Sequence, residues 1–150
     1  MIQKKTKYAI KALLSLAKEY KENRPMKIST ISKSEKIPRK FLEAIMLELR
    51  RVGFVESKMG VTGGYYLIKH PEEIMLSNII RLTGGPIALL PCVSLNFYEP
   101  CAECHHEESC GLRDVVLEVR EASIKILSKT SLADILKREI KLERKLKMQQ

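Results

Sequence analysis

The sequence has no apolar run long enough to anchor or export the chain. No stretch approaches the roughly 20 apolar residues of a membrane span, and no N-terminal run has the length of a signal peptide. The sequence also lacks a phosphate-binding glycine loop and a paired nucleophile and base. We therefore expect a cytoplasmic protein with no membrane partner and no enzymatic activity.

Negative charge is scarce in one half of the chain only. Residues 1–70 contain 16 Lys and Arg against 6 Asp and Glu, whereas residues 71–150 contain 11 against 12. The net charge of +9 is therefore concentrated in the first half. A clustered positive field attracts a polyanion, either a nucleic acid or an acidic membrane surface. A merely solvated charged face is the less favoured explanation.

The spacing of apolar residues predicts three helices in this basic half. Residues 6–20 and 28–35 form the first two, and residues 38–51 form the third. Pro38 suits the first turn of that helix because its fixed φ is already helical. Two β-prone runs and a glycine-rich turn follow over residues 53–68. Three helices and a hairpin in this order predict a winged helix-turn-helix.

The third helix is expected to read DNA. A helix fills the major groove of B-DNA, and side chains near its N-terminus reach the base edges. Arginine donates two bonds to guanine and glutamate accepts from cytosine, so Arg39, Lys40 and Glu43 are the expected base readers. The alternative for Arg39 and Glu43 is an ordinary exposed i,i+4 pair. The expected core face of this helix consists of Leu42, Ile45, Leu49 and Val52. The expected opposite face consists of Arg39, Glu43, Met46 and Arg50.

Other residues are expected to bind phosphate and fix the register on DNA. Lys58 begins the wing turn, which has no acidic residue before Tyr65, and glycines there allow close approach of the backbone. Ser29, the expected cap of the second helix, and Thr30 can donate to a phosphate. The full set of expected DNA contacts is Ser29, Thr30, Arg39, Lys40, Glu43, Arg50, Arg51, Lys58 and Tyr65, with Lys4, Lys5 and Lys7 as further backbone contacts.

The second half combines an irregular loop with three further helices. Residues 77–83 predict a short helix that ends at glycine and proline. No period is sustained over residues 86–111, whereas helical spacing returns over residues 112–126. Ser131 and Asp134 predict the capping box of a last helix. We expect a mainly α fold with a small β-hairpin: a DNA-binding domain over 1–83, a cysteine-rich sensor loop over 84–111, and a long helix in need of a partner plus a C-terminal helix over 112–150.

Four cysteines lie within 19 residues of the loop, in the pattern C-x8-C-x2-C-x5-C. In a reducing compartment such crowding favours metal or redox chemistry over structural disulfides. Acidic neighbours without a compensating Lys or Arg disfavour a simple reactive thiolate. Thiolates suit iron–sulfur clusters and zinc alike, but Cys92 and Cys110 are widely spaced for the second half of a zinc site, so a cluster is favoured. The candidate ligands are Cys92, Cys101, Cys104, Cys110, His105 and His106, and the acidic neighbours are Glu99, Glu103, Glu107 and Glu108.

Seven motifs are distributed over nearly the whole chain, at residues 6–13 (TKYAIKAL), 41–43, 63–65 (GGY), 85–87, 91–93, 110–115 (CGLRDV) and 131–134 (SLAD). Together they resemble the Rrf2 family of winged-helix regulators, of the IscR, NsrR and CymR type. This resemblance implies a homodimer formed through the long helix, a palindromic operator and, in many members, an iron–sulfur cluster held by three cysteines. Those three cysteines correspond to Cys92, Cys104 and Cys110, and a 2Fe–2S cluster is favoured over a 4Fe–4S cluster.

The chain departs from the family pattern at three positions. Arg113 stands where one member supplies a histidine ligand, and Tyr8 stands where another supplies an aspartate from the partner subunit. The fourth ligand is therefore open, with Cys101, and also His105 and His106, as candidates. In the wing, Met59 replaces an arginine that is common in the family, which leaves Lys58 to serve.

The expected function is thus a dimeric, sequence-specific repressor that binds double-stranded DNA and is controlled by a cluster or by the redox state of its cysteine loop. Two alternatives stay open. One is a zinc-binding or cluster-free regulator that responds to thiol chemistry or a ligand. The other is a small iron–sulfur electron carrier, which would leave the basic half without a purpose.

Overall fold

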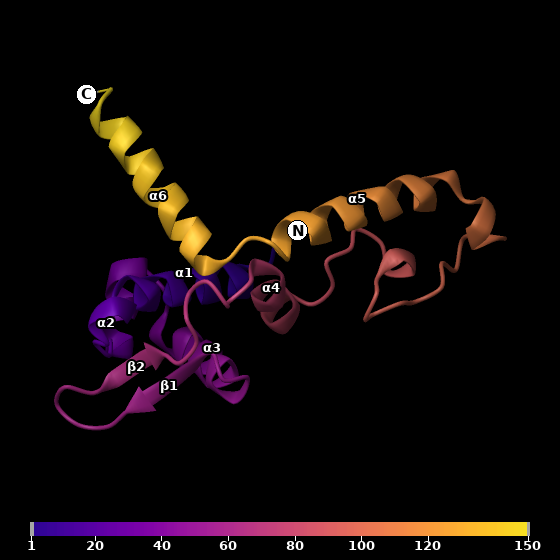
Figure 1. The fold of residues 1–150 in the computed structure, drawn as a ribbon. Coiled ribbons are helices and arrows are strands. Elements are labelled where there is room, and N and C mark those ends of the chain that lie inside the picture. The colour runs from indigo at the N-terminus through magenta and orange to yellow at the C-terminus, as the bar shows by residue number, and fades with distance from the viewer. Residues whose placement is uncertain (1, 150) are drawn as a thin grey trace.

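Three helices and a hairpin form the N-terminal unit of the computed structural model, which describes residues 2–149 (Figure 1). The strands pair antiparallel, with Val55 opposite Leu67 and Lys58 opposite Gly64. The chain is mainly helical with one small hairpin, which confirms the predicted fold class. The elements of this unit are α1 (Lys4–Lys18), α2 (Ile28–Glu35), α3 (Arg39–Arg51), β1 (Val55–Lys58) and β2 (Gly64–Leu67).

The core of this unit forms where α3 packs against α1. Leu42, Ile45 and Leu49 are fully buried, as their spacing predicts. Two assignments were wrong: Met46, expected on the charged face, is fully buried, and Val52, expected in the core, is 42% exposed. Residues 42, 45, 46 and 49 form one continuous i, i+3, i+4, i+7 stripe, whereas Val52 follows the last turn of the helix, where the chain turns toward β1. Each fully buried aliphatic side chain stabilises the fold by about 1.5–3 kcal/mol.

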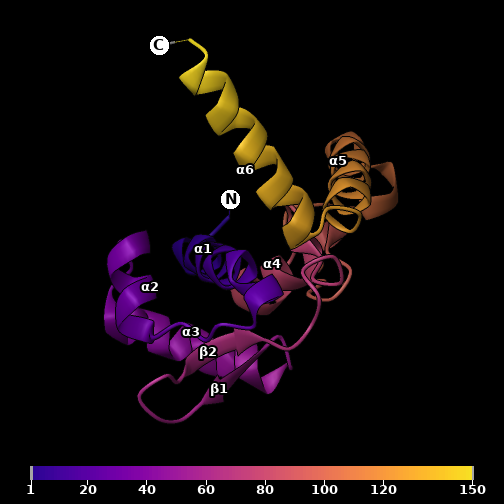
Figure 2. The same ribbon diagram turned by 60° about the vertical axis from the view of Figure 1, so that its left-hand side comes forward.

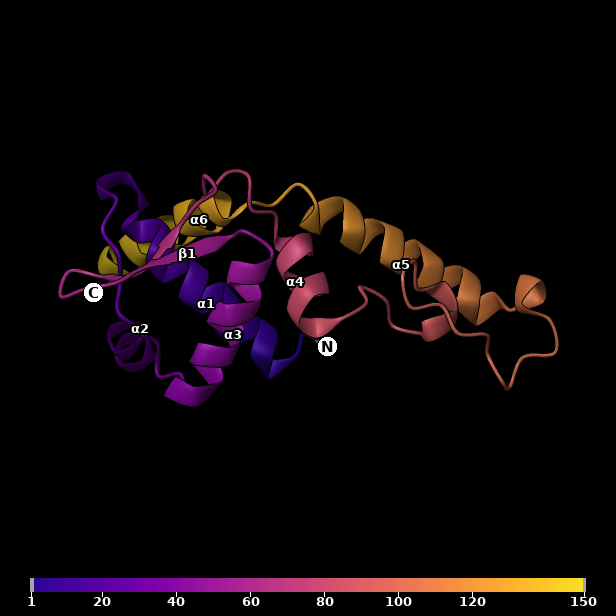
Figure 3. The same cartoon turned by 90° about the horizontal axis from the view of Figure 1, so that it is seen from below.

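The second half of the chain forms α4 (Leu76–Gly84), α5 (Gly111–Leu127) and α6 (Leu132–Lys147). Between α4 and α5 the loop contains only two short 3-10 turns, Pro91–Val93 and Glu107–Ser109. α5 and this loop extend away from the N-terminal unit as an arm, which is clearest from below (Figure 3). Within residues 2–149, no helix is both long and apolar enough to cross a membrane.

α6 is fastened to the N-terminal unit by its first residues and then projects past α1 (Figure 2). Leu132 is fully buried in the main core, and its N–H donates to the carbonyl of Ile74 at 3.0 Å. The predicted capping box is confirmed, because the Ser131 hydroxyl accepts from the Asp134 N–H at 3.2 Å and the Asp134 carboxylate accepts from the Ser131 N–H at 3.0 Å. The carboxyl end of α5 is thereby held close to the N-terminal unit.

Candidate functional site

The outermost row of α3 differs from the row that the sequence predicted. Because the buried stripe occupies one side of the helix, the opposite side consists of Lys40, Ala44, Leu47 and Arg51, at i, i+4, i+7 and i+11. All four of these residues are exposed. The expected base readers are therefore divided: Lys40 lies on the outermost row, whereas Arg39 and Glu43 lie beside it.

Ion pairs occupy the row of α3 beside the wing. Arg39 Nε lies 2.9 Å from Glu43 Oε1, and Arg50 Nε lies 2.6 Å from Glu56 Oε1 on β1. The free protein therefore contains the i,i+4 pair that was the alternative to base reading. The Arg39 and Glu43 side chains are 68% and 45% exposed, and pairs this exposed are worth at most about 1 kcal/mol, so either residue can exchange its partner for DNA.

A basic groove runs between the start of α2, the start of α3 and the wing. It contains three cations, Lys27, Arg39 and Lys58, and no acidic residue lines it. Four of the predicted DNA contacts line this groove, namely Ser29, Arg39, Lys58 and Tyr65. Lys27 was not among the predicted contacts, although it directly precedes a predicted helix start, where the backbone N–H groups favour a phosphate. The groove does not include the other predicted contacts, which are Thr30, Lys40, Glu43, Arg50 and Arg51 and the further backbone contacts Lys4, Lys5 and Lys7.

Backbone pairing attaches the wing to the start of α2. Met26 and Tyr65 exchange two hydrogen bonds of 2.8 Å, each residue donating its N–H to the carbonyl of the other. α2 begins directly after this bridge with Lys27 as its N-cap, so Ser29 lies in the first turn and is not the cap that the sequence predicted. A side chain at Gly64 would place Cβ 2.4 Å from the Met26 oxygen, so only glycine fits where the wing meets this bridge.

The cysteines of the loop gather at the far end of the arm, near the start of α5. The sulfurs of Cys101 and Cys110 lie close to the Cys104 thiol, and their proximity raises the pKa of Cys104 to about 12. Cys110 is the N-cap of α5, and its sulfur accepts from the Arg113 N–H at 3.4 Å. This backbone N–H, followed by the Cys104 thiol, lowers the pKa of Cys110. Cys92 is buried in a small apolar cluster that Cys101 also contacts.

Glu107 connects the two limbs of the cysteine loop. Its carboxylate accepts from the Cys101 N–H and from the Tyr98 hydroxyl, both at 2.9 Å, and lies 3.6 Å from Arg113 Nε. The hydrogen bonds from Cys101 and then Tyr98 hold the pKa of Glu107 below its ordinary value. The expectation that the acidic residues of the loop lack a compensating cation was therefore wrong for Glu107, because α5 brings Arg113 back to it.

The donor set of the loop fits a thiolate-bound group in its chemistry. The thiols of Cys101 and Cys110 lie near that of Cys104, and Cys92 lies in the cluster that Cys101 contacts. His105 and His106 are both exposed. Within the described part of the chain, no three Cys, His, Asp or Glu side chains already form a group that could hold a metal ion. Binding of a metal or cluster would therefore require the cysteines to converge further.

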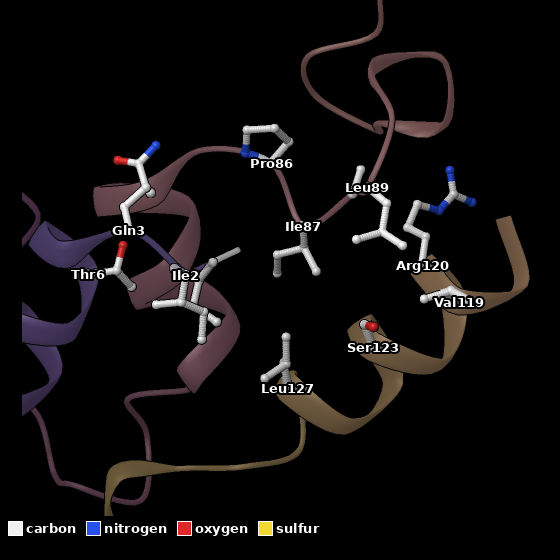
Figure 4. A pocket seen from close by; sticks show the side chains of 13 residues that line it. Ile2, Gln3, Thr6, Pro86, Ile87, Leu89, Val119, Arg120, Ser123 and Leu127 are labelled. Carbon is white, nitrogen blue, oxygen red and sulfur yellow. The ribbon is translucent and has the colours of Figure 1, made fainter. Parts of the chain in front are cut away.

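A cavity of about 180 Å³ lies where the N-terminal unit meets α5 (Figure 4). Ile87 and Leu127 point toward each other across it, Thr6 of α1 lies at one side, and the guanidinium of Arg120 points away from it. None of the predicted DNA contacts or metal ligands lines this cavity. Because its walls come from α1, α4, the following segment and α5, its shape depends on how α5 sits against the N-terminal unit.

The winged helix, with its outward-facing α3 and basic wing groove, has the architecture of a helix-turn-helix transcriptional regulator. The model of the Rrf2 family, described as an iron-dependent transcriptional regulator, matches residues 2–138, and the chain belongs to this family. The family and the relatives are transcriptional regulators, not enzymes.

Relatives and solved structures agree with this assignment over most of the chain. The chain is 42% identical over 138 residues to an rrf2-like HTH-type transcriptional regulator of Rhodobacter capsulatus, covering 91% of this chain and 92% of the relative. The structure of CymR, the global cysteine regulator of B. subtilis, superposes with a TM-score of 0.74 at 27% identity and covers 90% of this chain and 95% of its own. IscR of T. potens superposes with a TM-score of 0.71 at 25% identity, covering 93% and 88%. The resemblance drawn from the sequence motifs is confirmed.

Proposed function

We propose that the chain is a dimeric, sequence-specific DNA-binding repressor whose cysteine loop holds an iron–sulfur cluster. The observation that carries DNA binding is the basic wing groove beside the exposed face of α3. α3 would enter the major groove, and the cations of the wing groove would lie along the adjacent phosphates. A repressor of this kind acts by occupying the operator.

The salt dependence of binding tests this contact set. Lys27, Lys40, Arg51 and Lys58 are exposed, and Arg39 joins them if its pair with Glu43 opens. About five phosphate contacts per protomer predict a slope of log K against log salt of about −4 to −5 for one half-site. A slope near zero, measured by fluorescence anisotropy, would contradict DNA binding through this surface.

The exposed face of α5 supports a homodimer. Its apolar residues are spaced three, four, three and four apart, which is the pattern of a helix that pairs with another helix. Leu112, Val115 and Ile126 are 65%, 59% and 63% exposed, whereas Val116, on the side toward the loop, is buried. A second copy of α5 would cover this seam, and its two-fold symmetry would require a palindromic operator. The seam consists of Leu112, Val115, Val119, Ala122 and Ile126.

The cluster would be held by Cys92, Cys104 and Cys110, with Cys101 as the fourth ligand. Cys101 is preferred over His105 and His106 because it packs against the cluster that contains Cys92 and its thiol lies near that of Cys104, whereas both histidines are exposed. An iron–sulfur cluster would supply one-electron redox chemistry and sensitivity to oxidants at this position. Because Cys110 caps α5, any change in its sulfur acts directly on the first turn of the seam helix.

An anaerobic preparation separates the parts of this proposal. Iron and sulfide in stoichiometric amounts, with visible absorbance, are expected for the wild type, and Cys→Ala changes at positions 92, 104 and 110 should each abolish them. A colourless protein that contains stoichiometric zinc would show that the loop binds zinc instead of a cluster, and the proposed DNA binding would stand. Full iron retention in all three variants would show that the ligand assignment is wrong.

A further inference from the structure

The centre of the outermost row of α3 is apolar. Lys40 and Arg51 lie at its two ends, and Ala44 and Leu47 lie between them. Leu47 is 49% exposed even though the surrounding surface is strongly charged. Phe41 is also exposed, but it already has a partner within the protein, because its ring packs edge-on against that of Tyr8 on α1 with the ring centroids 6.0 Å apart.

We propose that Ala44 and Leu47 determine sequence specificity by packing against the 5-methyl groups of thymine. This inference rests on the proposed insertion of α3 into the major groove. Thymine is the only base that presents an apolar group there. The other base edges present hydrogen-bonding groups, and covering them with aliphatic carbon removes their water without replacing it.

The geometry of the helix fits contacts to neighbouring base pairs. Ala44 and Leu47 are three residues apart and therefore about 4.5 Å apart along the axis, while successive base pairs are about 3.4 Å apart. The two side chains can thus meet thymines at one or two consecutive steps. Lys40 and Arg51, about 16 Å apart along the axis, would reach phosphates on the two sides of a groove about 12 Å wide. The cations would hold the apolar pair over the base edges.

Replacing thymine by uracil tests the contact because it removes only the methyl group. The dimer would first select its best duplex from a random pool, and each thymine of that duplex would then be replaced singly by uracil. Burial of one methyl group predicts about three- to five-fold weaker binding at one or two positions of each half-site. Leu47→Ala should bind the parent duplex more weakly and should lose most of this discrimination.

A matched control is available on the opposite side of the molecule. Leu142 on α6 is 60% exposed, and Leu142→Ala should leave both the affinity and the uracil effect unchanged. Thermal unfolding of both variants establishes that each remains folded, and the uracil scan of the wild type provides a result that depends on no variant.

Two outcomes would overturn this inference while leaving the proposed DNA binding in place. One is a selected duplex in which no uracil substitution weakens binding by the wild type. The other is a uracil effect of equal size in the wild type and in Leu47→Ala. Failure to select any duplex would instead overturn the proposed DNA binding, and this inference with it.

Discussion

Replacing Gly64 with alanine should detach the wing from the start of α2, which carries another part of the DNA-binding surface. Its φ of +145° is disfavoured for other residues, and an added Cβ would lie 2.4 Å from the oxygen and 2.5 Å from the carbonyl carbon of Met26. Both obstructing atoms are backbone, so the contact is relieved only if the strand moves. Movement would break the two 2.8 Å hydrogen bonds between Met26 and Tyr65.

The magnitude of Gly64→Ala follows from these contributions. The backbone conformation costs about 1–3 kcal/mol, and the two hydrogen bonds contribute about 0.5–1.5 kcal/mol each, so a loss of about 2–6 kcal/mol in the free energy of unfolding is expected. Gly60 provides the matched control. It also has a positive φ, +105°, but a Cβ added there would meet nothing within 4 Å. Gly60→Ala should therefore cost only about 1–3 kcal/mol from its conformation.

Urea unfolding and a DNA titration distinguish the two variants. Gly64→Ala is expected to lose about 2 kcal/mol more than Gly60→Ala, from the broken hydrogen bonds, and to lose DNA affinity because Lys58 no longer faces the groove. If the wing detaches without global unfolding, the stability difference shrinks while the loss of affinity persists. Equal stability and equal affinity in the two variants would refute the assignment of Gly64 as the attachment point of the wing.

Two further substitutions test the loop and the joint between α1 and α4. Glu107→Gln should accelerate labelling of Cys101 in the reduced, metal-free protein, whereas Glu108→Gln, at an exposed neighbour, should not. Because the pKa of Glu107 is held below its ordinary value of 4.5, its contribution to the stability of the loop is complete above about pH 4.5 and is lost as the pH falls through the lowered pKa. Near-ultraviolet circular dichroism should detect this loss in the wild type and not in Glu107→Gln. Thr83→Val removes a buried hydroxyl that donates to the Ile79 carbonyl of its own helix at 2.7 Å and lies within hydrogen-bond distance, 3.0 Å, of the Thr6 hydroxyl on α1, and it should cost about 1–2 kcal/mol. Thr62→Val, on the exposed wing tip, should stay within about 0.5 kcal/mol of the wild type in the same urea titration, and an equal loss in both variants would count against the buried contact.

Local patterns in the sequence predicted the helices and the capping box well. α2 has the predicted bounds, and the box at Ser131 forms as expected, because each depends on residues within one or two turns. The faces of α3 were less predictable. A period of 3.6 residues identifies an apolar stripe, but whether Met46 or Val52 completes it depends on where the chain leaves the helix. The outermost row, with Leu47 at its centre, is defined only once the position of α1 is known.

The errors at the site share one physical origin, which is contact between segments distant in the sequence. Ser29 was expected to cap α2, but pairing of Met26 with the wing fixes the start of the helix so that Lys27 takes the cap position. Glu107 was expected to lack a cation, but the first turn of α5 places Arg113 beside it. The sequence shows how many sulfur donors the loop contains, whereas the proximity of Cys104 to two other thiols depends on the folded loop.

The position of α5 indicates how the loop would affect DNA binding. Its N-terminal end is capped by Cys110, its middle is tied to the loop by a 2.6 Å hydrogen bond from Arg120 to the Val93 carbonyl, and its carboxyl end leads directly into Leu132 in the core. The loop thus contacts the helix that would form the dimer seam rather than α3 or the wing. A change at the cysteines should therefore alter the spacing of the two reading helices, which must match half-sites about 34 Å apart or a multiple of that distance. We expect a full palindrome to bind with different affinity with and without the metal or cluster, and an isolated half-site duplex to bind equally well in both states. A half-site that responds as strongly as the palindrome would show that the loop acts within one protomer, through the junction of α5 with α1 and α4.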